Sequence, residues 1–556
     1  MKKVRINYNK DTCIGCGACQ IACKEQNCLM EGEFIRRVFV CSKNVPNGIR
    51  QYPYSFSCNH CEHPKCTPVC PTGAMHISSD GTILHDDNLC IACGRCYWAC
   101  PFGEISFSKS SGLTQKCDLC LNLRNNGKLP KCVSFCPTKS LTLVEEESVD
   151  NIKKENDGLT DNGIINHKTY LILGGGAAGL YAAKAIREED NNGRIIIISE
   201  DKHKPYRRPM LSKSPLKTFH GNDLALFNDN WYIDNNIELH LDEKIIKIIS
   251  DDKIVTTNKK TYKYDKCIYA LGSYAFVPPF LGKDKEGVYS VKTIEDIENI
   301  KHSCLEGNDA VIIGGGVIGI EFAQQLKNYG MNVTILESMP RLMAKQLDED
   351  LSLRFLKKIR EIGIQVETGI SIKEITGKNH VESVILSDGR IYPASVVIVS
   401  CGVKPNIKIA QEAGIICSRS VCVNKYMETN VCDIWACGDV AQLDNKNHCL
   451  WSQAVVEGDI AGRNATGKHI ELKGYDTSVI LNSLDLNLFS LGDVGSDTNN
   501  LEITFEREDC GLQINDRERK SFGKMTYCDG KLTGVALMGN LREMEIMRNN
   551  LERRND

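Results

Sequence analysis

Three absences narrow the class of protein to which this chain of 556 residues can belong. No apolar run reaches the roughly 18 residues of a membrane-spanning helix, because runs such as residues 310–320 are short and contain glycines. The basic N-terminal residues are followed by no apolar segment of a signal peptide, and no twin-arginine signal is present. The net charge of −3 supplies no basic field for nucleic acid or an anionic membrane. We therefore expect a cytoplasmic protein that binds neither.

Aromatic residues are also scarce, at 7% with four Trp, whereas cysteine is abundant, with 28 residues. The apolar fraction of 42% is that of an ordinary globular protein, and the length predicts three to four domains of about 150 residues each. An even number of cysteines is compatible with disulfides, but disulfide-dense chains are mostly small and secreted. The cysteines are therefore expected to be metal ligands or free thiols.

Sixteen of the cysteines form four groups within the first 140 residues, and the last cysteine of three groups precedes a proline. The groups are Cys13, Cys16, Cys19 and Cys23; Cys58, Cys61, Cys66 and Cys70; Cys90, Cys93, Cys96 and Cys100; and Cys117, Cys120, Cys132 and Cys136. A 4Fe–4S cluster takes three thiolates from one tight turn and a fourth from elsewhere. The spacing therefore predicts four such clusters. Zinc sites use paired C-x-x-C at longer separations, so His60 and His63 are not expected to bind metal.

The sequence around these groups resembles the four-cluster electron-transfer subunit of the DMSO reductase family. The resemblance extends over residues 1–145. The stretches that carry it are residues 57–103, CIGCGACQIACKEQN from residue 13 and KCDLC from residue 116. It implies a tandem of bacterial-ferredoxin-like halves that exchange ligands. The exchanged ligands would be Cys23, which joins Cys117, Cys120 and Cys132; Cys136, which joins Cys13, Cys16 and Cys19; and Cys70 and Cys100, which change places between the middle groups. Such subunits have no substrate site and connect a catalytic subunit to another redox partner.

A glycine-rich loop follows a polar stretch that is predicted to be a linker, residues 146–168. An apolar strand over residues 169–173 leads into G-x-G-x-x-G, formed by Gly174, Gly176 and Gly179. An alanine-rich helix and a second strand, residues 194–199, then lead to Glu200. Such glycines let the backbone approach a pyrophosphate at a helix N-terminus, and the acid accepts hydrogen bonds from a ribose.

The same pattern recurs about 140 residues later. A strand over residues 310–313 precedes Gly314, Gly316 and Gly319, and a further helix and strand end at Glu337. Two such units in one chain predict FAD together with a nicotinamide cofactor. A carboxylate at Glu337 favours the 2′-hydroxyl of NAD over the 2′-phosphate of NADP, although the nearby Arg341 leaves NADP open.

Residues 169–467 resemble the flavoprotein reductases of the pyridine nucleotide-disulfide oxidoreductase superfamily, in the branch of rubredoxin reductase, ferredoxin reductase and the flavin part of NADH-dependent nitrite reductase. The motifs are PYRRPMLSK at 205–213, YALGS at 269–273, CGVKPN at 401–406 and TNVCDIWACGDV at 429–440. The resemblance implies that Lys213 and Glu321 flank the flavin N5 as catalytic residues and that Asp439 binds the ribityl chain. The other implied FAD contacts are Arg208, Lys213, Gly272 and Gly438.

The chain departs from the disulfide reductases of that superfamily, because residues 206–214 contain no C-x-x-x-x-C. The flavin is therefore expected to pass electrons to something other than an adjacent disulfide. The same spacing recurs between Cys417 and Cys422 and between Cys432 and Cys437, beside the flavin motif. We expect these to be free buried thiols, with a thiol relay at Cys437 as the alternative.

The predicted fold is α/β with α+β. Residues 478–492 resemble the small C-terminal domain of the nitrite reductase flavin module. The predicted domains are a ferredoxin domain at 1–145, a linker at 146–168, an FAD domain at 169–287 and 404–468, an NAD domain at 288–403, and a small α+β domain at 469–556.

The sequence thus predicts an iron–sulfur flavoprotein oxidoreductase, in an anaerobic setting, that moves electrons between NAD(H), FAD and four 4Fe–4S clusters. The expected partner is a separate redox enzyme, either a molybdenum or tungsten pterin enzyme or a carbon monoxide dehydrogenase. The alternatives are a soluble NADH:ferredoxin exchanger, a self-contained NADH oxidase, and an iron–sulfur sensor or scaffold. The terminal substrate, the direction of electron flow, the cluster potentials and the oligomeric state, including a homodimer, stay open.

Overall fold

The computed structural model describes residues 2–10, 12–45, 48–147, 168–213, 216, 224–483, 486–494, 501–508, 520–528, 531–541, 544, 547–548 and 551. The chain divides into two compact units, residues 1–163 with 511–517 and residues 164–510 with 518–556. The predicted linker lies almost wholly outside the described residues. Among the described helices, none is long and apolar enough to cross a membrane.

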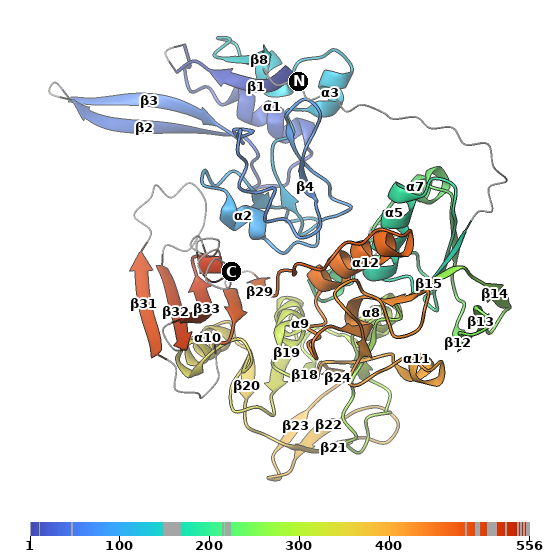
Figure 1. Cartoon of the computed structure of the whole chain (residues 1–556). Coiled ribbons are helices and arrows are strands. Elements are labelled where there is room, and N and C mark those ends of the chain that lie inside the picture. The colour runs from blue at the N-terminus through green and yellow to red at the C-terminus, as the bar shows by residue number, and fades with distance from the viewer. Residues whose placement is uncertain are drawn as a thin grey trace, which may run out of the picture. The chain divides into compact units, whose positions relative to one another are not determined.

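The described part of the first unit contains four short helices and a long hairpin of β2 and β3 (Figure 1). Its strands form four antiparallel pairs: β1 (Lys2–Tyr8) with β8 (Leu141–Glu147), β2 (Arg37–Val45) with β3 (Gly48–Phe56), β4 (Met75–Ile77) with β5 (Ile83–His85), and β6 (Ser106–Phe107) with β7 (Thr114–Gln115). Its helices are α1 (Ala18–Gln26), α2 (Arg95–Ala99), α3 (Leu121–Asn125) and α4 (Lys131–Ser134). Cysteines make up a large share of the buried apolar clusters among its described residues, so these clusters form around the thiols.

The second unit begins with a five-stranded parallel sheet in the order β11-β10-β9-β15-β27. Its strands are β9 (Thr169–Leu173), β10 (Arg194–Ile198), β11 (Ile237–His240), β15 (Lys266–Tyr269) and β27 (Ile434–Ala436). Tyr170 and Ile172 on β9 join the core on one face, while Leu171 and Leu173 join the core on the other. A sheet that is buried on both faces needs continuous apolar strands, which explains the sequence TYLIL.

A second parallel sheet repeats this design in the order β17-β24-β18-β19-β20. Its strands are β17 (Val288–Ser290), β18 (Asp309–Ile313), β19 (Asn332–Leu336), β20 (Gln365–Glu367) and β24 (Val396–Val399). Each parallel sheet is accompanied by a three-stranded antiparallel sheet. These sheets consist of β12 (Ile245–Ile249), β13 (Ile254–Thr257) and β14 (Thr261–Lys263), and of β21 (Ile372–Thr376), β22 (Ser383–Leu386) and β23 (Ile391–Pro393).

The chain leaves the first of these halves through β16 (Ser273–Ala275) and returns through β25 (Val403–Pro405), and the two strands pair antiparallel. The helices of the two halves are α5 (Ala177–Glu189), α6 (Met210–Lys213), α7 (Asp229–Asp234), α8 (Ile294–Ser303), α9 (Val317–Asn328), α10 (Glu349–Glu361), α11 (Lys408–Glu412) and α12 (Trp451–Ala465). The short elements β26 (Val421–Cys422), η1 (Gly438–Val440) and β28 (Ala441–Gln442) complete the return.

Helices α5 and α12 pack closely beside the first sheet (Figure 1). A Cβ atom at Gly458 would lie 2.3 Å from the carbonyl oxygen of Ala178, and one at Gly462 would lie 2.4 Å from that of Ala182. Only glycine therefore permits this approach, which brings the loop before α12 to the end of the sheet.

The C-terminal residues form a five-stranded antiparallel sheet in the order β29-β30-β33-β32-β31. Its strands are β29 (Val479–Ser483), β30 (Leu486–Gly492), β31 (Leu501–Glu508), β32 (Lys520–Cys528) and β33 (Lys531–Gly539). Lys524 on this sheet forms a buried ion pair with Asp348, and Ser490 Oγ donates to the carbonyl of Gln346 at 2.6 Å. The described structure is a mixed α/β fold, as the sequence predicts, while the exact domain boundaries stay predictions.

Candidate functional site

Glycines with positive φ shape two of the cysteine-bearing turns. Gly17 lies between Cys16 and Cys19 with a φ of 75°, and Gly94 lies between Cys93 and Cys96 with a φ of 74°. Each glycine is the residue before a helix, α1 or α2, so the third cysteine of the group falls in the first helical turn. This left-handed conformation is readily adopted by glycine, and it reverses the chain between successive thiols.

The first and fourth cysteine groups lie against each other in the first unit. One cavity is lined by Cys13, Cys16, Cys19 and Cys136 together. Burial raises the pKa of Cys23, and the adjacent thiols of Cys117, Cys132 and Cys120 raise it further. Cys23 therefore lies with the fourth group and Cys136 with the first, which is the arrangement that the resemblance implies.

The second and third groups lie together in the same way. Cys66 and Cys100 share an apolar cluster with Cys96 and Cys70. Burial raises the pKa of Cys66 to about 11, and Cys100 contributes, although Lys116 opposes the shift. Burial also raises the pKa of Cys96, with contributions from Cys93, Cys90 and Cys70. Cys100 thus lies near the second group and Cys70 near the third.

The donor set fits 4Fe–4S clusters better than a single metal ion. Within the described residues, no three His, Cys, Asp or Glu side chains come close enough to hold one ion. In a 4Fe–4S cluster each of the four thiolates binds a different iron atom, so the thiolates stay apart. His60, between Cys58 and Cys61, is buried, and its Nε2 has no hydrogen-bond partner among the described residues, which fits a donor to the sulfur of a bound cluster.

Two buried cations support the same assignment. Lys116 and Arg36 are buried beside the cysteine groups and form no ion pair with a described carboxylate. Burial lowers the pKa of Arg36, but the thiols of Cys132, Cys117, Cys19 and Cys23 more than offset this, so the pKa is raised. A buried cation needs a nearby negative charge, and clusters with four thiolates would supply it.

The structure clarifies the two histidines of the second group. His60 Nδ1 accepts a hydrogen bond from the backbone N–H of Ile83 at 3.1 Å. Burial, followed by Lys116 and Arg124, holds the pKa of His60 well below its usual value, so the ring is neutral. His63 is exposed. That neither histidine binds metal stays a prediction.

The glycines of the first glycine loop have two different roles. Two of them permit close backbone contacts, and one leaves room for a ligand. A Cβ at Gly174 would lie 2.1 Å from the Ala270 carbonyl oxygen, and one at Gly179 would lie 2.0 Å from that of Gly174. A Cβ at Gly176 would meet nothing within 4 Å. Gly176 also directly precedes α5, where backbone N–H groups favour a phosphate. The loop therefore fits a dinucleotide.

The second loop repeats this geometry before α9. A Cβ at Gly314 would lie 2.4 Å from the Ser400 carbonyl oxygen, and one at Gly319 would lie 2.1 Å from that of Gly314, whereas Gly316 again meets open space. Glu337 accepts hydrogen bonds from the backbone N–H groups of Gly315 at 2.6 Å and Met339 at 2.7 Å. Its carboxylate is therefore fixed beside the loop.

The two acids that follow the strands differ in their surroundings. Glu200, which follows β10, is exposed and lies 2.7 Å from Lys244. Glu337 is anchored by the loop, and the nearby Arg341 donates to the backbone carbonyls of Leu347 at 3.1 Å and Ala344 at 3.4 Å. Arg341 therefore holds its own loop together.

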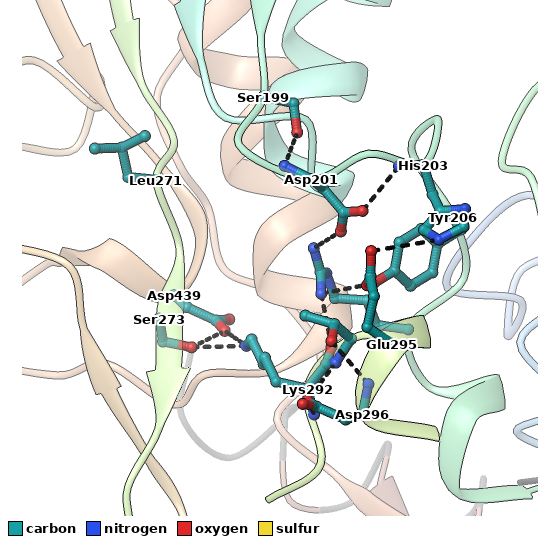
Figure 2. A network of polar contacts seen from close by, with 12 residues as sticks. Ser199, Asp201, His203, Tyr206, Leu271, Ser273, Lys292, Glu295, Asp296 and Asp439 are labelled. Atoms are coloured by element: carbon teal, nitrogen blue, oxygen red, sulfur yellow. Dashed lines mark hydrogen bonds and ion pairs between the residues drawn. The ribbon is translucent and has the colours of Figure 1, made fainter. Parts of the chain in front are cut away.

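Asp439 of the second flavin motif lies in a small polar network with two residues from distant segments (Figure 2). Asp439 Oδ2 accepts from Ser273 Oγ at 2.6 Å and lies 3.3 Å from Lys292 Nζ. Lys292 Nζ also donates to Ser273 Oγ at 2.8 Å. The sequence interpretation did not include Lys292, which belongs to none of the motifs used. Gly272, with a φ of 62°, would place a Cβ in open space beside this network.

Arg208 connects the PYRRPMLSK motif to the same network. It lies 3.1 Å from Asp201 and donates to the carbonyl of Lys292 at 2.7 Å. It also lies over the ring of Tyr206, with its guanidinium carbon 4.7 Å from the ring centroid. Arg208 therefore fixes the backbone that carries Lys292, and a direct contact with FAD stays a prediction.

Lys213 and Glu321 lie together, and their place at the flavin N5 stays a prediction. Lys213 Nζ is 2.8 Å from Glu321 Oε1, and Ser212 Oγ donates to the other carboxylate oxygen. Lys213 ends α6 and Glu321 lies in α9, so the pair links the motif after the first loop to the helix of the second. Glu321 is only 5% exposed, which makes its pairing with a cation necessary.

A buried acid contacts the backbone of the second flavin motif. Glu457 on α12 accepts a hydrogen bond from the backbone N–H of Gly438 at 2.8 Å. Burial raises the pKa of Glu457 to about 8. The sequence interpretation missed this residue, because nothing in its local spacing sets it apart from other residues of the helix.

The cysteines outside the four groups are free thiols, as expected, in the part of the chain that the structure describes. Cys437 is fully buried, and burial raises its pKa, so the thiol stays protonated. The expectation of burial is wrong for Cys432, which is exposed, and Cys417 and Cys422 are only partly buried. Cys422 ends the two-residue strand β26, and Cys417 and Cys432 lie on loops, where few neighbouring side chains cover them.

Comparison with known proteins identifies both parts of the chain. A family model for pyridine nucleotide-disulphide oxidoreductase matches residues 168–458, just over half of the chain, and one for a 4Fe–4S dicluster domain matches residues 50–146. The NADH-rubredoxin oxidoreductase of Clostridium acetobutylicum is 33% identical over 58% of this chain and 81% of its own length. A crystal structure of the C. acetobutylicum NADH:rubredoxin oxidoreductase superposes with a TM-score of 0.59, at 28% identity, over 70% of this chain and 96% of that one.

Two relatives from Bacillus subtilis are longer than the matched region. The nitrite reductase (NAD(P)H) is 29% identical over 68% of this chain and 46% of its own length. The electron transfer subunit of the assimilatory nitrate reductase is 28% identical over 70% of this chain and 50% of its own length. The chain thus spans about half the length of these two relatives.

Proposed function

The chain belongs to the pyridine nucleotide-disulphide oxidoreductase family, and from that premise we propose that it moves electrons between NAD(H), FAD and four 4Fe–4S clusters. It is an NAD(P)H oxidoreductase that also contains a 4Fe–4S domain. We propose further that the clusters exchange electrons with a separate redox enzyme rather than with a substrate bound to this chain.

One observation carries the proposal: a single chain contains two glycine loops with room for a dinucleotide and cysteine groups that lie against each other in pairs. Gly176 and Gly316 both leave open space in front of a helix N-terminus, which supports two dinucleotide sites. The exchanged positions of Cys23 and Cys136 support paired cluster sites. A bound FAD would accept an electron pair as hydride and release the electrons singly, which clusters require.

Two sets of residues have separate roles at the proposed flavin site. Lys213 and Glu321 form a buried ion pair between the two glycine-loop halves, and we propose that it lies at the flavin N5 and orients the nicotinamide against it. Asp439, held by Ser273 and Lys292, is placed to accept hydrogen bonds from a ribityl chain.

The loop after β19 favours NADH over NADPH. Glu337 presents a fixed carboxylate where the adenosine ribose is expected, and this repels a 2′-phosphate. Arg341 was the residue that left NADP open, and its guanidinium is engaged with the carbonyls of Leu347 and Ala344. NADP(H) stays the less favoured cofactor.

The partner that we propose is a molybdenum or tungsten pterin enzyme, with carbon monoxide dehydrogenase as the second choice. The relative that is named an electron transfer subunit of a nitrate reductase supports a role in delivering electrons to another protein. A soluble NADH:ferredoxin exchanger is the alternative. A self-contained NADH oxidase is disfavoured, because a reactive cysteine is missing from residues 206–214. An iron–sulfur sensor or scaffold would not need two open glycine loops.

The test is to capture the full chain from its native cells without oxygen and to identify the proteins and metals that accompany it. A molybdenum, tungsten or nickel enzyme at near-equal amount supports the proposed role. A lone flavin-loaded chain that reduces free ferredoxin with NADH makes it an exchanger instead. A chain whose flavin is not bleached by NADH, or which has no flavin, would contradict both and favour the sensor.

A further inference from the structure

Two basic side chains of the first unit are buried between cysteine groups and have no acidic partner in the part of the chain that the structure describes. Lys116 is 7% exposed and Arg36 is 3% exposed. By contrast, Arg124 is paired with Asp80 and His85 with Asp87. Of the described carboxylates, none forms an ion pair with Lys116 or Arg36. Because an isolated buried charge is costly, a fold retains it where another charge compensates for it.

Lys116 lies between the second and fourth groups. Its Nζ donates to the backbone carbonyl of Cys117 at 2.5 Å and to that of Ile83. The N–H of Ile83 in turn donates to His60, which lies between Cys58 and Cys61. Cys58 and Cys117 also belong to one apolar cluster. The ammonium group therefore borders on the ligands of two clusters.

Arg36 occupies the corresponding position between the first and fourth groups. Its Nη1 donates to Ser55 Oγ at 3.0 Å, and Ser55 Oγ lies 3.3 Å from Cys19 Sγ. Its Nη2 donates to Ser57 Oγ at 2.7 Å. Since Cys132 shares an apolar cluster with Cys19, the guanidinium group also lies near two sets of ligands.

We propose that Lys116 and Arg36 are positioning residues that raise the reduction potentials of the clusters between which they lie. The cluster of Cys23, Cys117, Cys120 and Cys132 borders on both cations and is therefore reduced before the clusters of Cys13, Cys16, Cys19 and Cys136 and of Cys58, Cys61, Cys66 and Cys100. The inference rests on the proposed four-cluster assignment.

The physical reason is the charge that each cluster gains. Reduction of a 4Fe–4S cluster adds one electron, so the reduced form is more negative by one unit and a nearby cation stabilises it. Charges that are buried together are screened far less than charges on the surface. The remaining cluster, of Cys70, Cys90, Cys93 and Cys96, borders on neither Lys116 nor Arg36. Its reduction potential therefore serves as an internal reference.

The test is a potentiometric titration of the intact, anaerobic chain, followed by electron paramagnetic resonance. Lys116→Met should lower the equilibrium constant for reduction at least tenfold, or 59 mV for a one-electron couple, at two of the four clusters. Arg36→Gln should shift a different pair, and the two variants should share one cluster. Lys116→Arg keeps the charge and should retain the wild-type potentials. Lys128→Met, at an exposed lysine, should change none of the four potentials.

Iron analysis of each variant separates the possible failures. If Lys116→Met does not retain its iron, Lys116→Gln decides, because its amide can still donate to the two backbone carbonyls. Unchanged potentials with full iron content, or an equal shift of all four clusters, would overturn the inference. A wild-type chain with far fewer than about 16 irons would instead overturn the four-cluster assignment on which it rests.

Discussion

Replacing Glu337 by alanine should weaken the preference for NADH over NADPH. The carboxylate is held by the N–H groups of Gly315 and Met339, so it remains in place when the nucleotide binds. In NADH it would accept hydrogen bonds from the ribose hydroxyls, and in NADPH it would face a phosphate. The substitution removes both the attraction and the repulsion, so the two cofactors should respond in opposite directions.

The expected size follows from the charges. Two unit charges at 4 Å repel by about 1 kcal/mol in water and by about 4 kcal/mol at an effective dielectric constant of 20. A lost hydrogen bond to a carboxylate costs roughly 1.5–3 kcal/mol for NADH. Since 1.4 kcal/mol corresponds to a factor of ten, the ratio of kcat/KM for NADH to that for NADPH should fall at least tenfold.

The assay is steady-state reduction of an artificial dye by either cofactor, without oxygen. Glu337→Gln removes the charge but keeps one acceptor, so it should relieve the repulsion while retaining part of the NADH binding. Glu361→Ala, at an exposed acid at the end of α10, is the matched control and should leave the ratio unchanged. An equal loss for NADH and NADPH in Glu337→Ala, or equal use of both by the wild type, would refute the reasoning.

Three further predictions concern buried groups. Cys437→Ser should leave NADH-driven dye reduction largely intact, because the thiol is buried and protonated; near-total loss of the activity would support a thiol relay. Lys524→Met should lower the free energy of unfolding by about 3–5 kcal/mol in denaturant titrations, because it leaves Asp348 buried without its cation. Adding Asp348→Asn should recover much of the lost stability, and no recovery would count against the ion pair. Burial raises the pKa of Glu457 from 4.5 to about 8, so between these pH values the folded state holds a proton that the unfolded state has released. The free energy of unfolding should therefore fall as pH rises from about 4.5 to about 8, by ~1.4 kcal/mol per pH unit. Glu457→Gln should remove that slope, and an unchanged slope would assign it to another group.

Much of the dinucleotide-binding part could be predicted because its signals are local. The strand over residues 169–173 coincides with β9, the strand before Gly314 agrees with β18 to within a residue, and the expected helix after the loop is α9. Continuous apolar strands and closely spaced glycines are constraints that act within some 30 residues. The cysteine spacing is local in the same sense, although the exchange of the fourth ligand came from the resemblance.

The residues that the sequence did not indicate act across long separations. Lys292 reaches Asp439 over 147 positions, and Lys524 reaches Asp348 over 176. Lys116 contacts Ile83, 33 positions away. A lysine in a loop or strand has no periodic pattern that distinguishes a buried charge from a solvated one, so only the folded arrangement shows that these cations are buried or paired.

The most direct test of the central claim is to add NADH to the anaerobic, full-length chain and to follow the flavin absorbance together with the paramagnetic resonance of the clusters. The account predicts about 16 irons per chain and cluster signals that appear after the flavin is bleached. Gly316→Ala, which fills the open space before α9, should abolish both changes when NADH is the donor but leave reduction by dithionite intact. A bleached flavin beside fully loaded clusters that NADH never reduces, whereas dithionite does, would contradict the claim that this chain connects the two.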